Sequence, residues 1–293
     1  MKASALEYPA LYKAASDLSE TSQNWYHRLL KSEYCLLIIA AALSMTASPS
    51  REVQSIQTIV FIALAALLLY RFKTKPEQDW YKGRALAESI KTSTWRYCIR
   101  SAPFENVTDV RVIRAEFRNH LLEILRANRY IGDRIPPDSA ADDQITISMD
   151  DIRALSIEGR KQFYMENRIR EQRGWYAKNA RDNRKAAARW VFACTTIYGV
   201  AIILLVLRPS FPEWEFWPFE PLIVLASAII GWMQIKKFNE LASAYTLTAH
   251  EIGIIQGRLQ EINSEEDLSE FINEAELAFS REHTQWVARQ NAL

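Results

Sequence analysis

The chain has 293 residues and an almost balanced charge, with 36 Lys and Arg against 35 Asp and Glu, so its overall charge indicates no particular partner. Its three cysteines form no CxxC pair, which argues against a disulfide framework. There are only eight glycines, and strand-like alternation is scarce. The sequence therefore predicts an all-α protein.

Four long apolar runs, at 34–47, 56–70, 190–207 and 221–235, contain no Asp, Glu, Lys, Arg or His. They form two predicted hairpins, with spans at about 34–48 and 56–72, and at about 190–207 and 221–236. A helix that crosses a bilayer needs about 20 apolar residues, with a range of about 17–25. The alternative is a soluble bundle with two very apolar core hairpins. Flanking residues favour membrane spans.

Basic residues lie at the outer ends of both predicted hairpins, whereas the turns contain mainly acids, prolines and aromatic rings. The positive-inside rule then places both termini and the long middle region in the cytoplasm. Aromatic and basic side chains at the ends of the spans would anchor them at the membrane interface. The predicted anchors are Trp190, Trp214, Trp217, Trp232, Lys236 and Lys237.

The remaining segments predict long cytoplasmic helices with coiled-coil-like packing. In chain order, these helices cover residues 17–31, 77–100, 107–131, 238–262 and 264–289. A further long helix is expected from Ile152 into the third span, capped by Asp150 or Asp151. Residues 133–149 contain adjacent prolines and no periodicity, so they form a predicted linker between modules 1–132 and 150–293.

Polar residues within the spans are candidates for lining a pore once several chains assemble. Their other explanation is hydrogen bonding and close packing between helices, and the sequence leaves both open. No charged residue lies within any of the four apolar runs, which argues against a proton-coupled pump or an ion-coupled carrier. The pore-lining candidates are Gln57, Thr58, Thr195, Thr196, Tyr198 and Ser227.

The stretch 153–189 is strongly basic, and it has two explanations. Its part beside the third span suits contact with anionic lipid. The part farther from the membrane could bind a nucleotide or an oligonucleotide, because the forked guanidinium groups of arginine match phosphate. The candidates for binding an anionic ligand are Arg160, Arg168, Arg170 and Arg173.

No catalytic constellation is recognisable. The four histidines are widely spread, and His250-Glu251 begins like an HExxH zinc motif but has Ile254 where the second histidine would stand. We therefore expect a protein that is not an enzyme and that uses no metal or cofactor.

The pattern of a helix ending in Trp-Tyr, a short two-span hairpin and a following helix resembles the SLATT family, the two-span effector domains of bacterial conflict systems. Trp25-Tyr26 precedes the first hairpin and Trp175-Tyr176 the second. Residues 145–183 and 280–289 resemble the entry and closing helices of such a module. Together they suggest a tandem arrangement over nearly the whole chain.

The resemblance implies a gated, pore-forming effector of an antiphage, abortive-infection system. Such an effector would assemble as a homo-oligomer in the bacterial inner membrane and depolarise it. A nucleotide-derived signal, made by a nucleotidyltransferase encoded nearby, would control the pore. The alternative function is a membrane-anchored helical scaffold that recruits a cytoplasmic partner without conducting ions.

Overall fold

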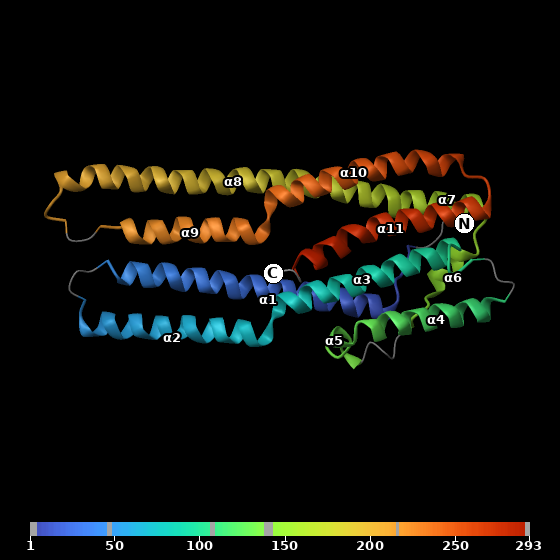
Figure 1. Cartoon of the computed structure of the whole chain (residues 1–293), viewed down its shortest axis with the longest axis horizontal. Helices are drawn as coiled ribbons and strands as arrows, with labels where there is room; N and C mark the ends of the chain where they lie inside the picture. The colour runs from blue at the N-terminus through green and yellow to red at the C-terminus, as the bar shows by residue number, and fades with distance from the viewer. Residues whose placement is uncertain (1–4, 46–48, 106–108, 138–142, 215–216, 291–293) are drawn as a thin grey trace. The chain divides into compact units, whose positions relative to one another are not determined.

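The computed structural model describes residues 5–45, 49–105, 109–137, 143–214 and 217–290, and within these ranges it contains helices and no strands (Figure 1). The all-α prediction is thus confirmed. The chain forms two compact units, each drawing on both halves of the sequence. Unit 1 contains residues up to Asn24, Pro76–Gly174 and residues from His250, and unit 2 contains Trp25–Lys75 and Trp175–Ala249.

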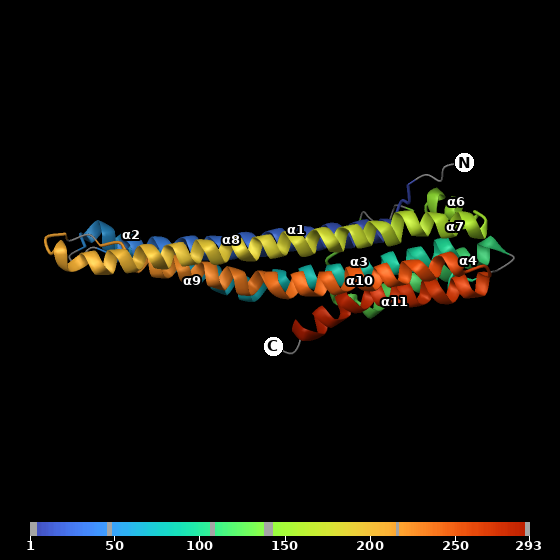
Figure 2. The same ribbon diagram turned by 90° about the horizontal axis from the view of Figure 1, so that it is seen from above.

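Unit 2 contains both hairpins. The first consists of the later part of α1 (Ala10–Leu43) and α2 (Arg51–Thr74), and the second of most of α8 (Glu171–Leu207) and α9 (Phe219–Lys236). Figure 2 shows α8 as a single long helix. Helix α2 begins at a side-chain cap, since Ser50 accepts a hydrogen bond from the amide of Val53.

Side-chain contacts place the helices of unit 2 in the order α2, α1, α9, α8. Arg71 of α2 pairs with Glu33 of α1 at 2.8 Å. A Cβ atom on Gly231 of α9 would lie only 2.7 Å from the Tyr34 hydroxyl of α1, so glycine permits this approach. Helix α8 packs on α9 through a cluster that contains Cys194, Ala226 and Ile229, surrounded by Trp190, Ala193, Ile197, Leu225 and Met233.

The two hairpins end in the same local structure. Lys75 follows α2 with φ 45°, and Lys237 follows α9 with φ 49°, both in the left-handed region. Each donates its amide to the carbonyl four residues earlier, at 2.9 Å, and the next helix starts at the following residue. These next helices are α3 (Pro76–Ile99) and α10 (Phe238–Glu261). The shared ending is what a tandem repeat of one module would produce.

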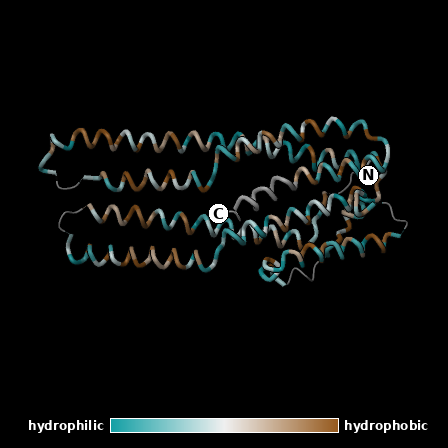
Figure 3. The backbone as a smooth tube through the Cα atoms, viewed as in Figure 1, coloured by the Kyte–Doolittle hydropathy of each residue, from teal (hydrophilic) through white to brown (hydrophobic). Residues whose placement is uncertain are grey.

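Among the residues that the structure describes, three helical segments are long and apolar enough to cross a membrane: Arg51–Ile99, Ile157–Ser210 and Phe219–Glu261. They contain the apolar parts of α2, α8 and α9 (Figure 3). Between 6% and 17% of the residues in their most apolar windows are buried within the chain, which leaves most of this surface for lipid or other chains. The span at 34–48 stays a prediction, and residues 46–48 lie outside the described ranges.

Unit 1 has its core around α3. Trp95 and Tyr97 of α3 are fully buried, and Tyr97 contacts the rings of Phe104 and Phe117. Phe117 lies on α4 (Val110–Ala127), whose buried face, with Ile113 and Leu121, confirms the amphipathic pattern. The predicted start of this helix, residues 107–108, lies outside the described ranges. A short helix, α5 (Arg129–Gly132), follows.

Part of the predicted linker is bound to the N-terminal segment of the chain. The Thr146 hydroxyl donates to the carbonyl of Glu7 at 2.8 Å, and the Glu7 amide donates to the Ser148 hydroxyl at 2.8 Å. The Leu11 amide donates to Gln144 at 3.1 Å. These bonds fix residues 143–148 within unit 1, although the segment has no periodicity of its own.

The predicted single helix from Ile152 into the third span is wrong. Helix α6 (Ile147–Arg153) is capped by Thr146. Residues 154–156 are not helical, and a new helix, α7 (Ile157–Tyr164), begins after them. Ser156 caps α7 by accepting from the Gly159 amide at 3.2 Å. Asp150 caps neither helix, because its carboxylate accepts from the Tyr97 hydroxyl at 2.7 Å and pairs with Arg114.

Candidate functional site

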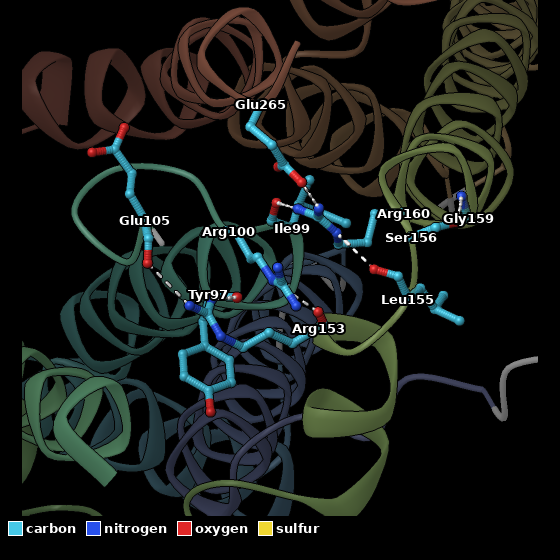
Figure 4. Close-up of polar contacts among 10 residues, drawn as sticks. All are labelled: Tyr97, Ile99, Arg100, Glu105, Arg153, Leu155, Ser156, Gly159, Arg160 and Glu265. Atoms are coloured by element: carbon cyan, nitrogen blue, oxygen red, sulfur yellow. Dashed lines mark hydrogen bonds and ion pairs between the residues drawn. The ribbon is translucent and has the colours of Figure 1, made fainter. Parts of the chain in front are cut away.

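Three arginines converge at the C-terminal end of α3 (Figure 4). Arg153 donates to the carbonyl of Tyr97 at 2.5 Å and to that of Glu105 at 3.1 Å. Arg160 donates to the carbonyl of Ile99 at 2.7 Å, and Arg100 donates to the carbonyl of Arg153 at 3.0 Å. We call Arg100, Arg153 and Arg160 the arginine cluster.

The local structure explains why arginine occurs here. The last carbonyls of a helix have no partner within the helix, and they form the negative end of its dipole. Two buried arginines satisfy such carbonyls of α3, while Arg100 itself follows the helix with φ 62°, a left-handed ending. Helices α6 and α7 supply Arg153 and Arg160, so the cluster joins them to α3.

The cluster has more positive than negative charge. Its carboxylate partner is Glu265, the first residue of α11 (Glu265–Gln290), which pairs with Arg160. The Arg160 side chain is 1% exposed, whereas that of Glu265 is 51% exposed. Burial and the neighbouring Arg160 lower the pKa of Arg100, an effect that Glu265 opposes. An anion that replaced the exposed carboxylate would meet a buried guanidinium at the start of a helix.

A second buried ion pair lies in the same unit. Arg168 donates to Glu276 of α11 through Nε at 2.9 Å and Nη2 at 2.6 Å, and the Tyr164 hydroxyl donates to the same carboxylate at 2.8 Å. Burial alone would lower the pKa of Arg168, but the Glu276 carboxylate raises it above the ordinary value. The guanidinium also lies 4.9 Å from the ring centre of Phe279.

This pair lies at an irregular turn. Residues Met165–Arg170 form a π-helical turn between α7 and α8, and it contains Arg168. Such turns are frequent at functional sites because they shift the register of the side chains around the helix. Here the turn brings Tyr164 and Arg168 to one carboxylate.

The four predicted arginines thus have different surroundings. Arg160 and Arg168 are buried and bonded to partners within the chain, so an anionic ligand would have to displace Glu265 or Glu276. Arg170 and Arg173 are exposed, and Arg173 donates to Gln256 at 2.8 Å. Sequence reasoning missed Arg100 and Arg153, since neither belongs to the densest part of the basic stretch.

The pore-lining candidates lie outside the packing between α8 and α9. Thr195, Thr196 and Tyr198 of α8 and Ser227 of α9 are exposed in the single chain. The hydroxyls of Thr195 and Thr196 donate to the carbonyls four residues earlier, each at 2.9 Å. On α2, Thr58 bonds in the same way to Gln54, and Gln57 donates to Ser44. Their role in lining a pore stays a prediction.

The predicted interface anchors separate into two groups. Trp190, Trp232, Lys236 and Lys237 are half-buried: Trp190 lies in the middle of α8, where the basic stretch meets the apolar run, and the other three lie at the C-terminal end of α9. Trp214 and Trp217 lie in the turn between these helices with their ring centres 5.8 Å apart, Trp214 exposed and Trp217 buried. Their anchoring role stays a prediction.

Comparison with protein families accounts for almost the whole chain. The model of the SMODS and SLOG-associating 2TM effector domain 3 matches residues 9–161, more than half of the chain. The model of the SMODS and SLOG-associating 2TM effector domain 1 matches residues 164–286. The chain belongs to the SLATT family. It contains two SLATT domains in tandem, as the repeated Trp-Tyr and hairpin pattern predicted.

SLATT domains are two-span domains, and the apolar helices α2, α8 and α9 agree with this description. The protein is therefore a helical, multi-pass membrane protein with effector domains of bacterial conflict systems. No curated protein and no solved structure matches the chain. The proposed boundary at residues 133–149 stays a prediction.

Proposed function

We propose that this SLATT protein is a gated, pore-forming effector of an antiphage system, controlled by a nucleotide-derived signal. Several copies would assemble in the inner membrane, with both termini and unit 1 in the cytoplasm, and opening would depolarise the membrane. The proposal assigns no catalytic step to the chain. It rests on the family membership and on one observation in unit 2, the exposed hydroxyl groups on an otherwise apolar hairpin.

That observation supports a pore for a physical reason. A single chain leaves Thr195, Thr196 and Ser227 uncovered, although the helices around them are apolar. Assembly of several copies around these faces would bring hydroxyls to a common path, where they can contact water or ions. The absence of charge within the spans suits a weakly selective pore or a gate formed by an apolar constriction.

The arginine cluster supports control by an anion. A phosphate of the ligand would compete with the exposed Glu265 carboxylate for the buried Arg160 guanidinium. Because Arg160 also bonds to the end of α3, binding there would act on the contacts among α3, α7 and α11. Arg170 and Arg173 are exposed and are further candidates for contacting the ligand, which at Arg173 would compete with Gln256.

Ion flux into liposomes tests the proposal. Purified protein is reconstituted, and flux is recorded with and without candidate nucleotides and cyclic oligonucleotides. A flux that one ligand changes supports a gated pore, whereas silence from folded, inserted protein in every condition favours the scaffold. In the first case, Thr196→Leu should change the conductance severalfold. Ile202→Leu, at an exposed position without a hydroxyl about 120° around the same helix from Thr196, should leave it nearly unchanged.

A further inference from the structure

Trp232 of α9 is surrounded by basic side chains from two helices of unit 2. The ammonium of Lys31 lies 5.5 Å from the centre of its ring, and that of Lys236 lies 5.3 Å from it. The imidazole of His27 lies 5.5 Å away, edge-on. His27 and Lys31 are one turn apart on α1, and Trp232 and Lys236 are one turn apart on α9. Two helix faces therefore present three nitrogen-bearing groups to one indole.

Neighbouring acids do not neutralise the basic groups around Trp232. Glu33 of α1 pairs with Arg71, and Glu240 approaches Lys237 at 3.9 Å. Among the residues that the structure describes, no carboxylate lies within ion-pair distance of Lys31 or Lys236. Burial, with Lys236 and Lys31, lowers the pKa of His27 to about 4. The surroundings of Trp232 thus carry a positive potential without an internal counter-charge.

The position of Trp232 and Lys236 along α9 indicates which negative group could balance the positive charge around the indole. Trp232 and Lys236 lie in the last two turns of the helix, at the end of its apolar run. Indole rings and lysine stems at the end of a span lie at the depth of the lipid headgroups. Phosphate is the anionic group present at this depth, and phosphates of soluble molecules can reach it from the aqueous side.

We propose that His27, Lys31, Trp232 and Lys236 form a binding site for a phosphate group, which we call the indole site. The two ammonium groups would donate hydrogen bonds to the phosphate oxygens, and the indole would form the wall beside them. The phosphate would belong to a lipid headgroup or to a soluble phosphate compound. The indole site shares no residue with the arginine cluster, and it does not depend on the proposed pore.

Native mass spectrometry of the full chain in detergent tests the site. One titration uses phosphatidylglycerol, and the other uses inorganic pyrophosphate. The variant Lys31→Gln/Lys236→Gln should weaken binding of the first molecule by about fivefold for each lysine, or about 25-fold in all, at roughly 1 kcal/mol for a basic residue near a membrane surface. Lys73→Gln is the matched control, because Lys73 is an exposed lysine in the last turn of α2.

The two titrations separate the sources of the phosphate. A loss confined to phosphatidylglycerol assigns the site to lipid, and a loss confined to pyrophosphate assigns it to a soluble compound. Losses with both probes show a site that accepts either source. If the double variant binds both probes as well as the Lys73→Gln protein does, the indole site is not a phosphate site.

A second measurement detects phosphate at the indole site through the titration of His27, with both lysines kept. The charged groups that face His27 are Lys31 on its own helix and Lys236 on α9. A bound phosphate would offset their effect, so the midpoint of the His27 titration in histidine NMR should rise above about 4 when the bound probe is added. An unchanged midpoint at a saturating probe concentration would contradict the proposal.

Discussion

At the residue scale, Arg168 and Glu276 form an ion pair in which both partners are buried within unit 1. Both side chains are almost inaccessible, at 2% and 0% exposed. Two charges in such a place are tolerated because each satisfies the other, and the Tyr164 hydroxyl adds a third bond to the carboxylate. Removing one partner leaves the other charged and buried, which costs far more than the pair contributes.

Glu276→Gln should therefore lower the free energy of unfolding by about 3–5 kcal/mol, the usual cost of breaking a buried pair. Chemical denaturation in a mild detergent, followed by circular dichroism, measures this. Glu274→Gln is the control on the same helix: Glu274 pairs with Arg258, but both side chains are more than half exposed. Its loss should stay below about 1 kcal/mol. Equal losses in the two variants would contradict the assigned role of Glu276.

The sequence indicated two of the buried arginines of unit 1 but not their acidic partners. A basic run pointed to Arg160 and Arg168, because a high density of arginine along the chain is visible in the sequence. Their acidic partners, Glu265 and Glu276, come from another part of the chain, and 108 residues separate Arg168 from Glu276. Charge density along a chain carries no information about a partner so far away, so buried pairing could not be told from ligand binding.

At the element scale, a close approach between α1 and α3 depends on one glycine. A Cβ atom at Gly83 would lie 3.2 Å from the amide nitrogen of Ser19 and 3.3 Å from the carbonyl oxygen of Ala15. Both are backbone atoms, which cannot rotate away as the end of a side chain can. The Ser19 hydroxyl adds a bond of 3.0 Å to the carbonyl of Trp80, which holds the two helices at this distance.

Gly83→Leu should separate these helices and lower the free energy of unfolding by about 1–3 kcal/mol, the typical cost of overpacking. Gly253→Ala is the comparison, because a Cβ at Gly253 in α10 meets nothing within 4 Å. There the better helix propensity of alanine should stabilise by up to about 1 kcal/mol. Both changes are measured by the same denaturation experiment. A Gly83→Leu protein as stable as the native chain would show that the helices are free to move apart.

Most elements were predictable because their patterns are local. The predicted helices 77–100, 238–262 and 264–289 correspond to Pro76–Ile99, Phe238–Glu261 and Glu265–Gln290. The break before α7 was missed, since Asp150 and Asp151 resemble a cap as much as Ser156 does. Tertiary contacts decided between them: Tyr97 and Arg114 engage the Asp150 carboxylate.

At the scale of the whole molecule, the two SLATT domains follow each other in sequence, but the compact units do not. Each unit takes segments from both domains. Tandem modules are visible in a sequence because hydropathy and Trp-Tyr pairs repeat along it. The interleaving depends on contacts between the domains, such as those of Ser101 with Ser269 and of Arg160 with Glu265, and no periodicity in the sequence predicts these.

Cysteine labelling tests the four-span topology as a whole. After Cys35, Cys98 and Cys194 are replaced by serine, single cysteines are introduced at Ser50, Ser210 or Lys178. With four spans, a membrane-impermeant maleimide should label Ser50→Cys and Ser210→Cys on intact spheroplasts, and Lys178→Cys only after permeabilisation. A further variant, Lys13→Cys, tests the first span, because Lys13 is exposed and precedes it. With four spans it should be labelled only after permeabilisation, whereas if 34–48 does not cross the membrane it will be labelled from the same side as Ser50→Cys.

The long separation between Arg168 and Glu276 also has a consequence for synthesis. A ribosome adding about 5–20 residues per second needs about 5–20 s to make the 108 residues between them. During that interval the second hairpin emerges, while the carboxylates of α11 do not yet exist. The buried contacts of α11 within unit 1 can form only after both hairpins have been synthesised. A nascent chain that stalls before α11 would therefore carry its hairpins without a completed unit 1.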